Sequence, residues 1–374
     1  MTRMVGDGER RARALLTRAV EPGDKRVAQL VASIGAEATA QRLRIGDPRM
    51  EHVERYRDRI ERADAHADLA RVESVGGRLV VPGDLEWPTQ LDDLGLMAPL
   101  ALWVRGVADL RLTALRSVSV VGARAATPYG ERIASIFASD LAAAGWAVVS
   151  GGAFGIDAQA HLGALAARGM TIAVLACGVD VSYPPRHDSL FARIAADGLL
   201  VSEVPPGSAP HRTRFLVRNR VIAALTRGTV VVEAAIRSGS LSTAHDAEKL
   251  GRPVLVVPGP VDSMMSAGVH RELRRGALAV TSAAEIIEAV GGLGVDLAPM
   301  PSAPVLPRDE LDPLSARVLD SLPVRGAATV ESVARDAGLT PAETAAALGL
   351  LELGSFVRSG PEGWRLVRQR GVPR

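Results

Sequence analysis

The chain has 374 residues, 47% of them hydrophobic and 23% charged, a composition that excludes a disordered chain. At about 150 residues per domain, this length predicts two or three domains. The net charge is only +2, yet Lys25 and Lys249 are the only lysines among 44 basic residues. A coding bias toward arginine explains this excess, and so does phosphate recognition by guanidinium groups. Composition alone leaves both explanations open.

Several classes of protein are excluded by simple patterns. No uncharged apolar segment reaches the roughly 18 residues that a membrane-spanning helix needs. The first ten residues lack the apolar core of a signal peptide. The single cysteine, Cys177, excludes an intrachain disulfide and a cysteine-clustered zinc site. We therefore expect a cytoplasmic protein with no membrane segment, no metal and no cofactor.

The N-terminal quarter is predicted to be helical. Apolar residues recur at three- and four-residue spacing over 10–20, 24–34 and 50–72, separated by glycines. These segments predict a small helical domain over residues 1–75, of the sterile-alpha-motif or helix-hairpin-helix type. A connector from residue 76 to about residue 116 then leads into a different pattern.

From residue 117 onward, short apolar runs alternate with helical stretches. The runs cover 117–121, 147–150, 171–175, 199–202, 229–233, 254–257 and 277–280. This alternation predicts a parallel sheet with helices on both faces, and so an α/β fold with a Rossmann-like, doubly wound domain over residues 76–290. Residues 291–308 are rich in Gly and Pro and are predicted to be a linker. Residues 309–374 predict three helices and a hairpin, the outline of a winged helix, with a capping box at Thr340 and Glu343.

Three strand-to-helix junctions carry the residues suited to bind an anion. The carboxyl ends of parallel strands meet at one edge of a sheet, where helix N-termini offer N–H groups. In the first junction, Gly122 and Arg124 precede a helix that Thr127 caps and Pro128 begins. Arg124 is therefore placed to bind a phosphate, or to form a salt bridge at the rim of the sheet.

The second junction is a glycine-rich loop that contains Gly151, Gly152 and Gly155. Its glycines let a phosphate approach the backbone closely, although the spacing does not match a dinucleotide-binding motif. Asp157 and His161 are four residues apart on the following helix, and they favour a capping, hydrogen-bonded pair over a catalytic one. The third junction has hydroxyl side chains, Ser238, Ser240 and Thr243, that cap a helix, bind an anion, or do both.

The most informative segment is 204–232, which contains no Asp or Glu over 29 residues. Its basic side chains are His211, Arg212, Arg214, Arg218, Arg220 and Arg227, and Phe215 and Asn219 lie among them. Basic residues interleaved with an aromatic ring are typical of single-stranded nucleic-acid binding, in which guanidinium groups contact phosphates and the ring stacks on a base. A solvated basic face is the alternative. Asn219 is expected to hold its loop rather than to contact a base.

Taken together, these motifs resemble the DNA-processing protein A (Smf) family. The resemblance covers residues 80–290 closely and rests on ordered motifs: 121–124 with Tyr129, 150–157 with His161, 178–184, Ser202 with Glu203, 205–207, Phe215 with 218–220, 231–234, 238–244 and 257–259. It implies a non-catalytic protein that binds single-stranded DNA, forms a homodimer through the Rossmann-like domain, and helps to load a RecA-type recombinase in natural transformation and recombination.

Two departures from the family pattern concern the DNA contact. Leu216 and Val217 follow Phe215 where the family commonly has Pro, and no lysine is present near this loop. The residues expected to contact DNA are Gly122, Arg124, Tyr129, Gly151, Gly152, Gly155, His211, Arg212, Arg214, Phe215, Arg218, Asn219, Arg220, Ser238, Ser240 and Thr243. Among them, Arg124, Arg218 and Arg220 are expected to form one phosphate-binding rim with the glycine loop, while Phe215 stacks on a base.

Other readings of the sequence remain. A phosphoribohydrolase of related fold would need a P-G-G-x-G-T-x-x-E loop, and the chain offers only Pro258 and Gly259 before Pro260. No other catalytic template matches, so we expect no enzyme. An interaction adaptor working through the winged helix is a third possibility, because its third helix, 341–353, lacks Lys and Arg and is expected to dock protein. An apolar stretch at 277–287, with Met264 and Met265, is the expected dimer surface.

Overall fold

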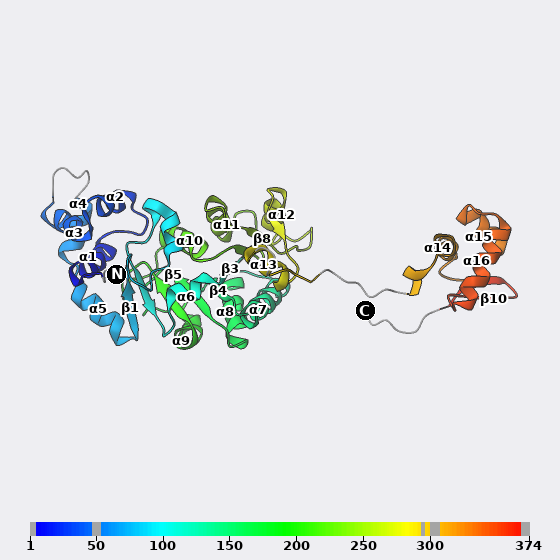
Figure 1. Ribbon diagram of the computed structural model, residues 1–374, viewed down its shortest axis with the longest axis horizontal. Helices are drawn as coiled ribbons and strands as arrows, with labels where there is room; N and C mark the ends of the chain where they lie inside the picture. The colour runs from blue at the N-terminus through cyan, green and yellow to red at the C-terminus, as the bar shows by residue number, and fades with distance from the viewer. Residues whose placement is uncertain (1–4, 47–53, 293–295, 300–306, 368–374) are drawn as a thin grey trace. The chain divides into compact units, whose positions relative to one another are not determined.

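The computed structural model describes residues 5–46, 54–292, 296–299 and 307–367 (Figure 1). The chain divides into two compact units, one ending at Pro299 and the other formed by the residues that follow. Most of the expected linker lies outside the described residues. No described helix is long and apolar enough to span a membrane.

The first unit is built on a nine-stranded sheet of order β1-β2-β6-β5-β4-β3-β7-β8-β9. All pairs from β6 to β9 are parallel, whereas β2 runs antiparallel to both β1 and β6. The strands are β1 (Gly77–Val80), β2 (Leu102–Arg105), β3 (Ser117–Val121), β4 (Ala147–Ser150), β5 (Thr171–Leu175), β6 (Leu199–Ser202), β7 (Thr229–Val231), β8 (Val254–Val256) and β9 (Leu278–Ala279). The seven predicted strands are confirmed, and the connector adds the two antiparallel ones.

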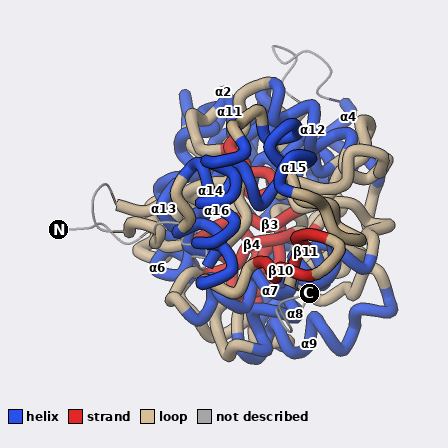
Figure 2. The backbone as a smooth tube through the Cα atoms, turned by 90° about the vertical axis from the view of Figure 1, so that its right-hand side faces the viewer, coloured by secondary structure: helices blue, strands red, loops and turns tan. Residues whose placement is uncertain are grey.

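Helices cover both faces of this sheet because its strands bury side chains on both sides (Figures 1 and 2). Val118 and Val120 pack toward α7 (Pro128–Ala143), α8 (Ile156–Ala166) and α13 (Ala283–Val290). Val121 and Val149 pack on the other side toward α10 (Arg212–Leu225), α11 (Ser240–Lys249) and α12 (Ala267–Arg274). The predicted Rossmann-like doubly wound architecture is thus confirmed.

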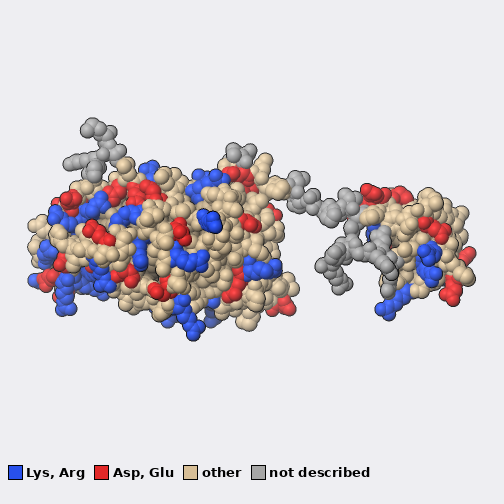
Figure 3. All heavy atoms as spheres, turned by 90° about the horizontal axis from the view of Figure 1, so that it is seen from below, with Lys and Arg blue, Asp and Glu red and all other residues tan. Residues whose placement is uncertain are grey.

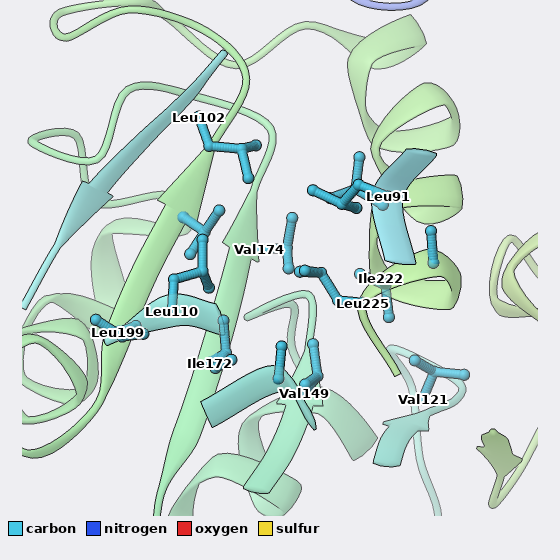
Figure 4. Close-up of a cluster of buried hydrophobic side chains, with 14 of the residues drawn as sticks. Leu91, Leu102, Leu110, Val121, Val149, Ile172, Val174, Leu199, Ile222 and Leu225 are labelled. Atoms are coloured by element: carbon cyan, nitrogen blue, oxygen red, sulfur yellow. The ribbon is translucent and has the colours of Figure 1, made fainter. Parts of the chain in front are cut away.

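The core on the α10 face is made mainly of aliphatic side chains, with Trp87 also buried in it (Figure 4). Ile222 and Leu225 of α10 meet Ile172 and Val174 of β5, and all four are almost fully buried. This cluster extends to α6 (Leu110–Leu115) and to the 3-10 segment η1 (Thr89–Met97) of the connector. Because α10 is anchored here through its second half, its first turns are fixed at the carboxyl edge of the sheet.

The N-terminal segment forms five helices, which are α1 (Asp7–Ala19), α2 (Lys25–Ile34), α3 (Ala36–Ile45), α4 (Glu54–Glu61) and α5 (Ala65–Ser74). The single helix expected over 50–72 is wrong: the described part is two helices, because Asp64 caps α5 by accepting bonds from His66 N and Ala67 N. Ala14 and Val72 share a buried cluster with Trp103 and Leu175, so α1 and α5 pack directly on the sheet unit.

The second unit is a winged helix, as predicted. It contains η3 (Pro307–Glu310), α14 (Pro313–Asp320), α15 (Val330–Ala337), α16 (Pro341–Leu353), β10 (Val357–Gly360) and β11 (Gly363–Leu366), around its own apolar cluster. The Thr340–Glu343 capping box is present at the start of α16. The same helix exposes Leu350 and Leu353.

Candidate nucleic-acid interface

A pocket of about 400 Å³ lies where the sheet reverses its strand order. The chain winds outward from β3 through β4 and β5 to β6 and then crosses to β7 on the other side of β3, and in such sheets ligands bind outside the carboxyl ends at this point. All three junctions line the pocket, together with the first half of α10, so the expected convergence is observed. Its lining includes Gly122, Arg124, Ala153, Asp157, Phe215, Leu216, Arg218, Asn219, Arg237, Ser238, Ser240 and Thr243.

Arg124 is an exposed cation in the lining of this pocket. Its guanidinium carbon lies 5.1 Å from the centroid of the Phe215 ring, a cation–π contact between the first junction and α10. Among the described residues no carboxylate lies within ion-pair distance of it. The loop behind it is fixed, because Thr127 donates from N and Oγ1 to Glu233 at 2.9 and 2.6 Å. Arg124 is thus a positioned but unneutralised charge.

Arg218 lies beneath the pocket rather than on its rim. Its side chain is buried, and its Nη1 donates to the carbonyl oxygens of Gly151, at 2.9 Å, and Val174. Burial lowers the pKa of this guanidinium to about 10, partly offset by the charge of Asp157, so the group stays protonated at neutral pH. A side chain at Gly151 would collide with it. Arg218 therefore ties β4 and β5 to α10 and lends its charge to the pocket from below.

Asp157 and His161 do not form the pair that their spacing predicts. Asp157 accepts bonds from Gly151 N and Ala153 N, at 3.2 and 3.4 Å, and desolvation raises the pKa of its carboxyl group. His161 Nδ1 lies 2.7 Å from Thr171 Oγ1. Because that hydroxyl donates to Val148 O, His161 must donate to it, which fixes the imidazole tautomer. The carboxylate thus shapes the glycine loop and the histidine supports the core.

Asn219 holds a loop, as expected. Its Nδ2 donates to Ser242 Oγ at 2.8 Å and to Gly239 O at 3.2 Å, which fastens α10 to the start of α11. There, Ser238 Oγ and Ser240 Oγ lie 2.7 Å apart, and Ser238 Oγ also accepts a bond from Ser240 N at 3.4 Å. The hydroxyls therefore line the pocket, and Ser238 also contacts the first backbone N–H of α11.

The structure corrects the expected rim at Arg220. This residue is 4% exposed, and its Nη1 and Nη2 meet the Glu203 carboxylate at 2.5 and 2.7 Å. Arg214 likewise pairs with Glu21 at 2.7 and 2.9 Å, and this contact lowers the pKa of the Glu21 carboxyl group. The acid-free segment is thus balanced by acids from elsewhere in the chain. Neither guanidinium is available at the pocket.

Other expected contacts lie outside the pocket. Tyr129 donates its hydroxyl to Pro258 O at 2.8 Å, and His211 and Arg214 line a separate hollow beside Glu21. Gly152 and Gly155 form the loop after β4, and Arg212 is exposed one turn before Phe215. At Gly155, with φ +73°, a side chain would strike the carbonyl of Ala123. Gly155 therefore lets the loop after β4 pack closely on the loop after β3. The sequence suggests instead that these glycines let a phosphate approach the backbone.

Among the pocket residues that the expected DNA contacts left out are Leu216 and Arg237. Leu216 is 56% exposed beside Phe215, and Arg237 is exposed on the loop after β7. Arg237 could have been found from the sequence, because it directly precedes the Ser-Gly-Ser motif of the third junction. With Arg124 and Arg218 it gives the lining three guanidinium groups against the single carboxylate of Asp157. On the face drawn in Figure 3, by contrast, acidic and basic side chains are interspersed.

The fold and the site define a Rossmann-type α/β protein with an arginine-lined pocket at its switch point and a separate winged helix. The family model of DNA recombination-mediator protein A matches residues 78–291, and that of the DprA winged helix domain matches residues 301–363. The chain belongs to this DprA/Smf family.

Relatives match most of the chain. A putative DNA processing protein DprA of Mycobacterium tuberculosis is 44% identical over 372 residues, which cover 97% of this chain and 95% of the relative. Protein Smf of Escherichia coli is 39% identical over 286 residues, 72% of each chain.

Two solved structures are similar to this one. DNA processing protein A of Streptococcus pneumoniae has a TM-score of 0.64 and 29% identity and covers 77% of this chain and 100% of its own. The Helicobacter pylori protein, described for its unique single-stranded DNA binding mode, has a TM-score of 0.50 and 32% identity, and covers 54% of this chain and 91% of its own.

Proposed function

We propose that this protein binds single-stranded DNA at the pocket formed by the three junctions and α10. The observation that carries the proposal is the contact of Arg124 with the half-buried ring of Phe215, in a pocket lined by three arginines. A cation beside an aromatic ring matches the two parts of a nucleotide, because the phosphate is anionic and the base has a flat face. The relative from Helicobacter pylori, described as binding single-stranded DNA, supports the same ligand.

Single-stranded DNA is favoured over a duplex because the site offers an aromatic ring, Phe215 in the first turns of α10, beside a cation. Base stacking on Phe215 requires a base that is free of its partner and its neighbours. In the winged helix, α16 has no Lys or Arg to enter a major groove. Competition binding tests this preference: a labelled oligonucleotide of dT bound to the full chain should be displaced by unlabelled single strands and not by an equal concentration of a blunt duplex. Equal displacement by both would contradict it.

The same proposal extends to recombination. Family membership supports a role in which the protein protects single-stranded DNA, dimerises through the Rossmann-like domain, and helps to load a RecA-type recombinase, in the cytoplasm and without catalysis. Recombinase filament formation on DNA precovered with a single-strand-binding protein tests this step. Addition of the chain should shorten the lag before filament growth, and an unchanged lag would contradict it.

The dimer surface is proposed at the β9 edge of the sheet. Leu278 is 53% exposed and Met264 79% exposed, whereas Ala283 and Ile286 of the expected stretch are buried against the sheet. The β9 strand has a partner on one side only, and an open edge of this kind is a pairing surface. Light scattering at tens of micromolar should give the mass of a dimer for the parent, and Leu278→Lys should shift it toward a monomer.

A further inference from the structure

Exposed aromatic side chains are rare in this chain and gather beside the pocket. Aromatic residues make up 3% of the sequence. Among the described residues, Phe154 and Tyr183 are the exposed aromatic side chains, at 42% and 40%. Phe154 follows Ala153, which lines the pocket, and Tyr183 lies in the loop after β5. Both rings therefore lie at the carboxyl edge of the sheet that also carries Phe215.

Contacts within the protein hold these rings in place. The centroid of the Tyr183 ring is 5.6 Å from that of Phe215. The Phe154 ring meets His187 edge-on at 4.7 Å, and His187 in turn packs at 6.0 Å against the buried ring of Phe191. His187 Nδ1 donates to Gly152 O at 3.1 Å. Each exposed ring is thus supported from behind, and little conformational freedom is lost when a ligand stacks on it.

Charge at this edge favours an anionic chain beside the rings. Arg186 is exposed next to His187, and no carboxylate among the described residues lies within ion-pair distance of it. The nearby carboxylate, Asp188, accepts a hydrogen bond from Ser182 Oγ at 2.6 Å. Arg124 contacts the ring of Phe215, and Arg186 follows Tyr183 by three residues, so both loops carry a cation beside an aromatic residue.

We infer that Phe154 and Tyr183 are additional base-stacking positions, which extend the DNA site from the pocket across the loops after β4 and β5. This inference rests on the proposed function and names the path of the strand beyond the pocket. A base stacked on Phe215 brings the following nucleotides over Tyr183 and Phe154, while their phosphates face Arg124 and Arg186. Stacking accepts every base, so the extension adds affinity and length dependence without sequence preference.

The test compares ring and non-ring residues at position 154 in the full chain. Phe154→Leu keeps apolar volume against His187 and removes the stacking face, whereas Phe154→Trp restores one. With dT oligonucleotides, Phe154→Leu should weaken binding of a strand of about 15 nucleotides by about fivefold or more, with the salt slope unchanged. The effect on a strand of about 4 nucleotides, which fills the pocket alone, should be much smaller. Leu112→Ala, an exposed leucine on α6 at the opposite edge, is the matched control and should bind as the parent does.

Fluorescence reports the stacking directly. Trp87, Trp103 and Trp146 are buried and Trp364 is half-buried in β11, so the parent is the reference spectrum. The emission that Phe154→Trp adds to it reports on position 154 and should be quenched by long dT strands. If Phe154→Leu binds long strands like the parent and the new tryptophan is not quenched, while Phe215→Leu weakens binding, the inference is overturned and the proposed function stands. If the parent itself binds no single strands, both fail. If Phe154→Leu binds DNA like the parent but weakens self-association or recombinase binding, the ring is a protein contact and the inference is likewise overturned.

Discussion

The guanidinium of Arg220 and the carboxylate of Glu203 face each other inside the protein, with two N–O distances of 2.5 and 2.7 Å. Their side chains are 5% and 8% exposed. Glu203 directly follows β6, and Arg220 is in the middle of α10, so the pair fixes the helix that carries Phe215 against the end of β6, the last of the parallel strands. Arg220, which the sequence suggests as a DNA contact, is thus part of the support of the site.

Arg220→Ala is therefore expected to destabilise the fold rather than to remove a phosphate contact. Loss of one partner leaves the other charge buried and unpaired, which costs about 3–5 kcal/mol in the free energy of unfolding. Urea unfolding measures this cost, and the double substitution Arg220→Met with Glu203→Leu should recover most of it. Arg214→Met is the control, because its pair with the half-exposed Glu21 contributes about 1 kcal/mol or less. Equal stability of parent and Arg220→Ala would contradict this role.

His161 is expected to remain neutral well below physiological pH. Burial, and to a smaller degree the charges of His187 and Arg218, lowers the pKa of its imidazole to about 3. Because the folded-state pKa lies below the unfolded value of about 6.5, the unfolded chain binds the proton first. The stability that this group contributes is fully present above about pH 6.5 and declines as the pH falls toward 3.

Two measurements check this behaviour. Nitrogen NMR should show no titration of His161 between about pH 5 and 8, with the proton on Nδ1 throughout. In unfolding experiments, the parent should lose more stability between about pH 6.5 and 5 than His161→Gln, which has no proton to bind. A His161 signal that titrates near pH 6.5 would show that the ring is solvated.

Removal of residues 309–374 is expected to leave most single-strand affinity intact. The winged helix has its own apolar cluster, separate from those of the first unit, and α16 presents Leu350 and Leu353 to its surroundings without a basic residue. Arg358 and Arg365 of the wing can make weak contacts with the DNA backbone. Arg368 and Arg370 lie outside the described residues. Anisotropy measurements on the shortened chain should show less than about a tenfold loss, or 1.4 kcal/mol. A larger loss would place part of the DNA site in the winged helix.

Much of the architecture could be predicted because it follows from local patterns. Apolar runs of four or five residues separated by helical stretches identify the seven parallel strands, and Thr127 and Thr340 mark helix starts through their caps. Parallel topology alone brings the three junctions to one edge. The antiparallel strands β1 and β2 were missed because they lie among Gly, Pro and Trp residues that suggest a connector.

The roles of the arginines could not be predicted, because pairing depends on contacts between distant residues. Arg214 is neutralised by Glu21, which is 193 positions away. Arg218 donates to carbonyl oxygens of β5 and of the loop after β4, which no charge pattern reveals. A segment without acids is therefore not an unpaired basic surface. Of the arginines that line the pocket with Phe215, Arg124 and Arg237 are exposed.

The most direct measurement of the proposed DNA site is the anisotropy of a labelled dT strand titrated with the parent, Arg124→Ala and Phe215→Leu between about 50 and 200 mM salt. Arg124→Ala should weaken binding and reduce the salt slope by about 0.7, the value for one lost phosphate contact on a single strand. Phe215→Leu should weaken binding by about 1–3 kcal/mol with the slope unchanged. Arg111→Ala, on α6 at the opposite edge, should match the parent in both. If Arg124→Ala and Phe215→Leu also bind like the parent at every salt concentration, the DNA site does not lie at this pocket.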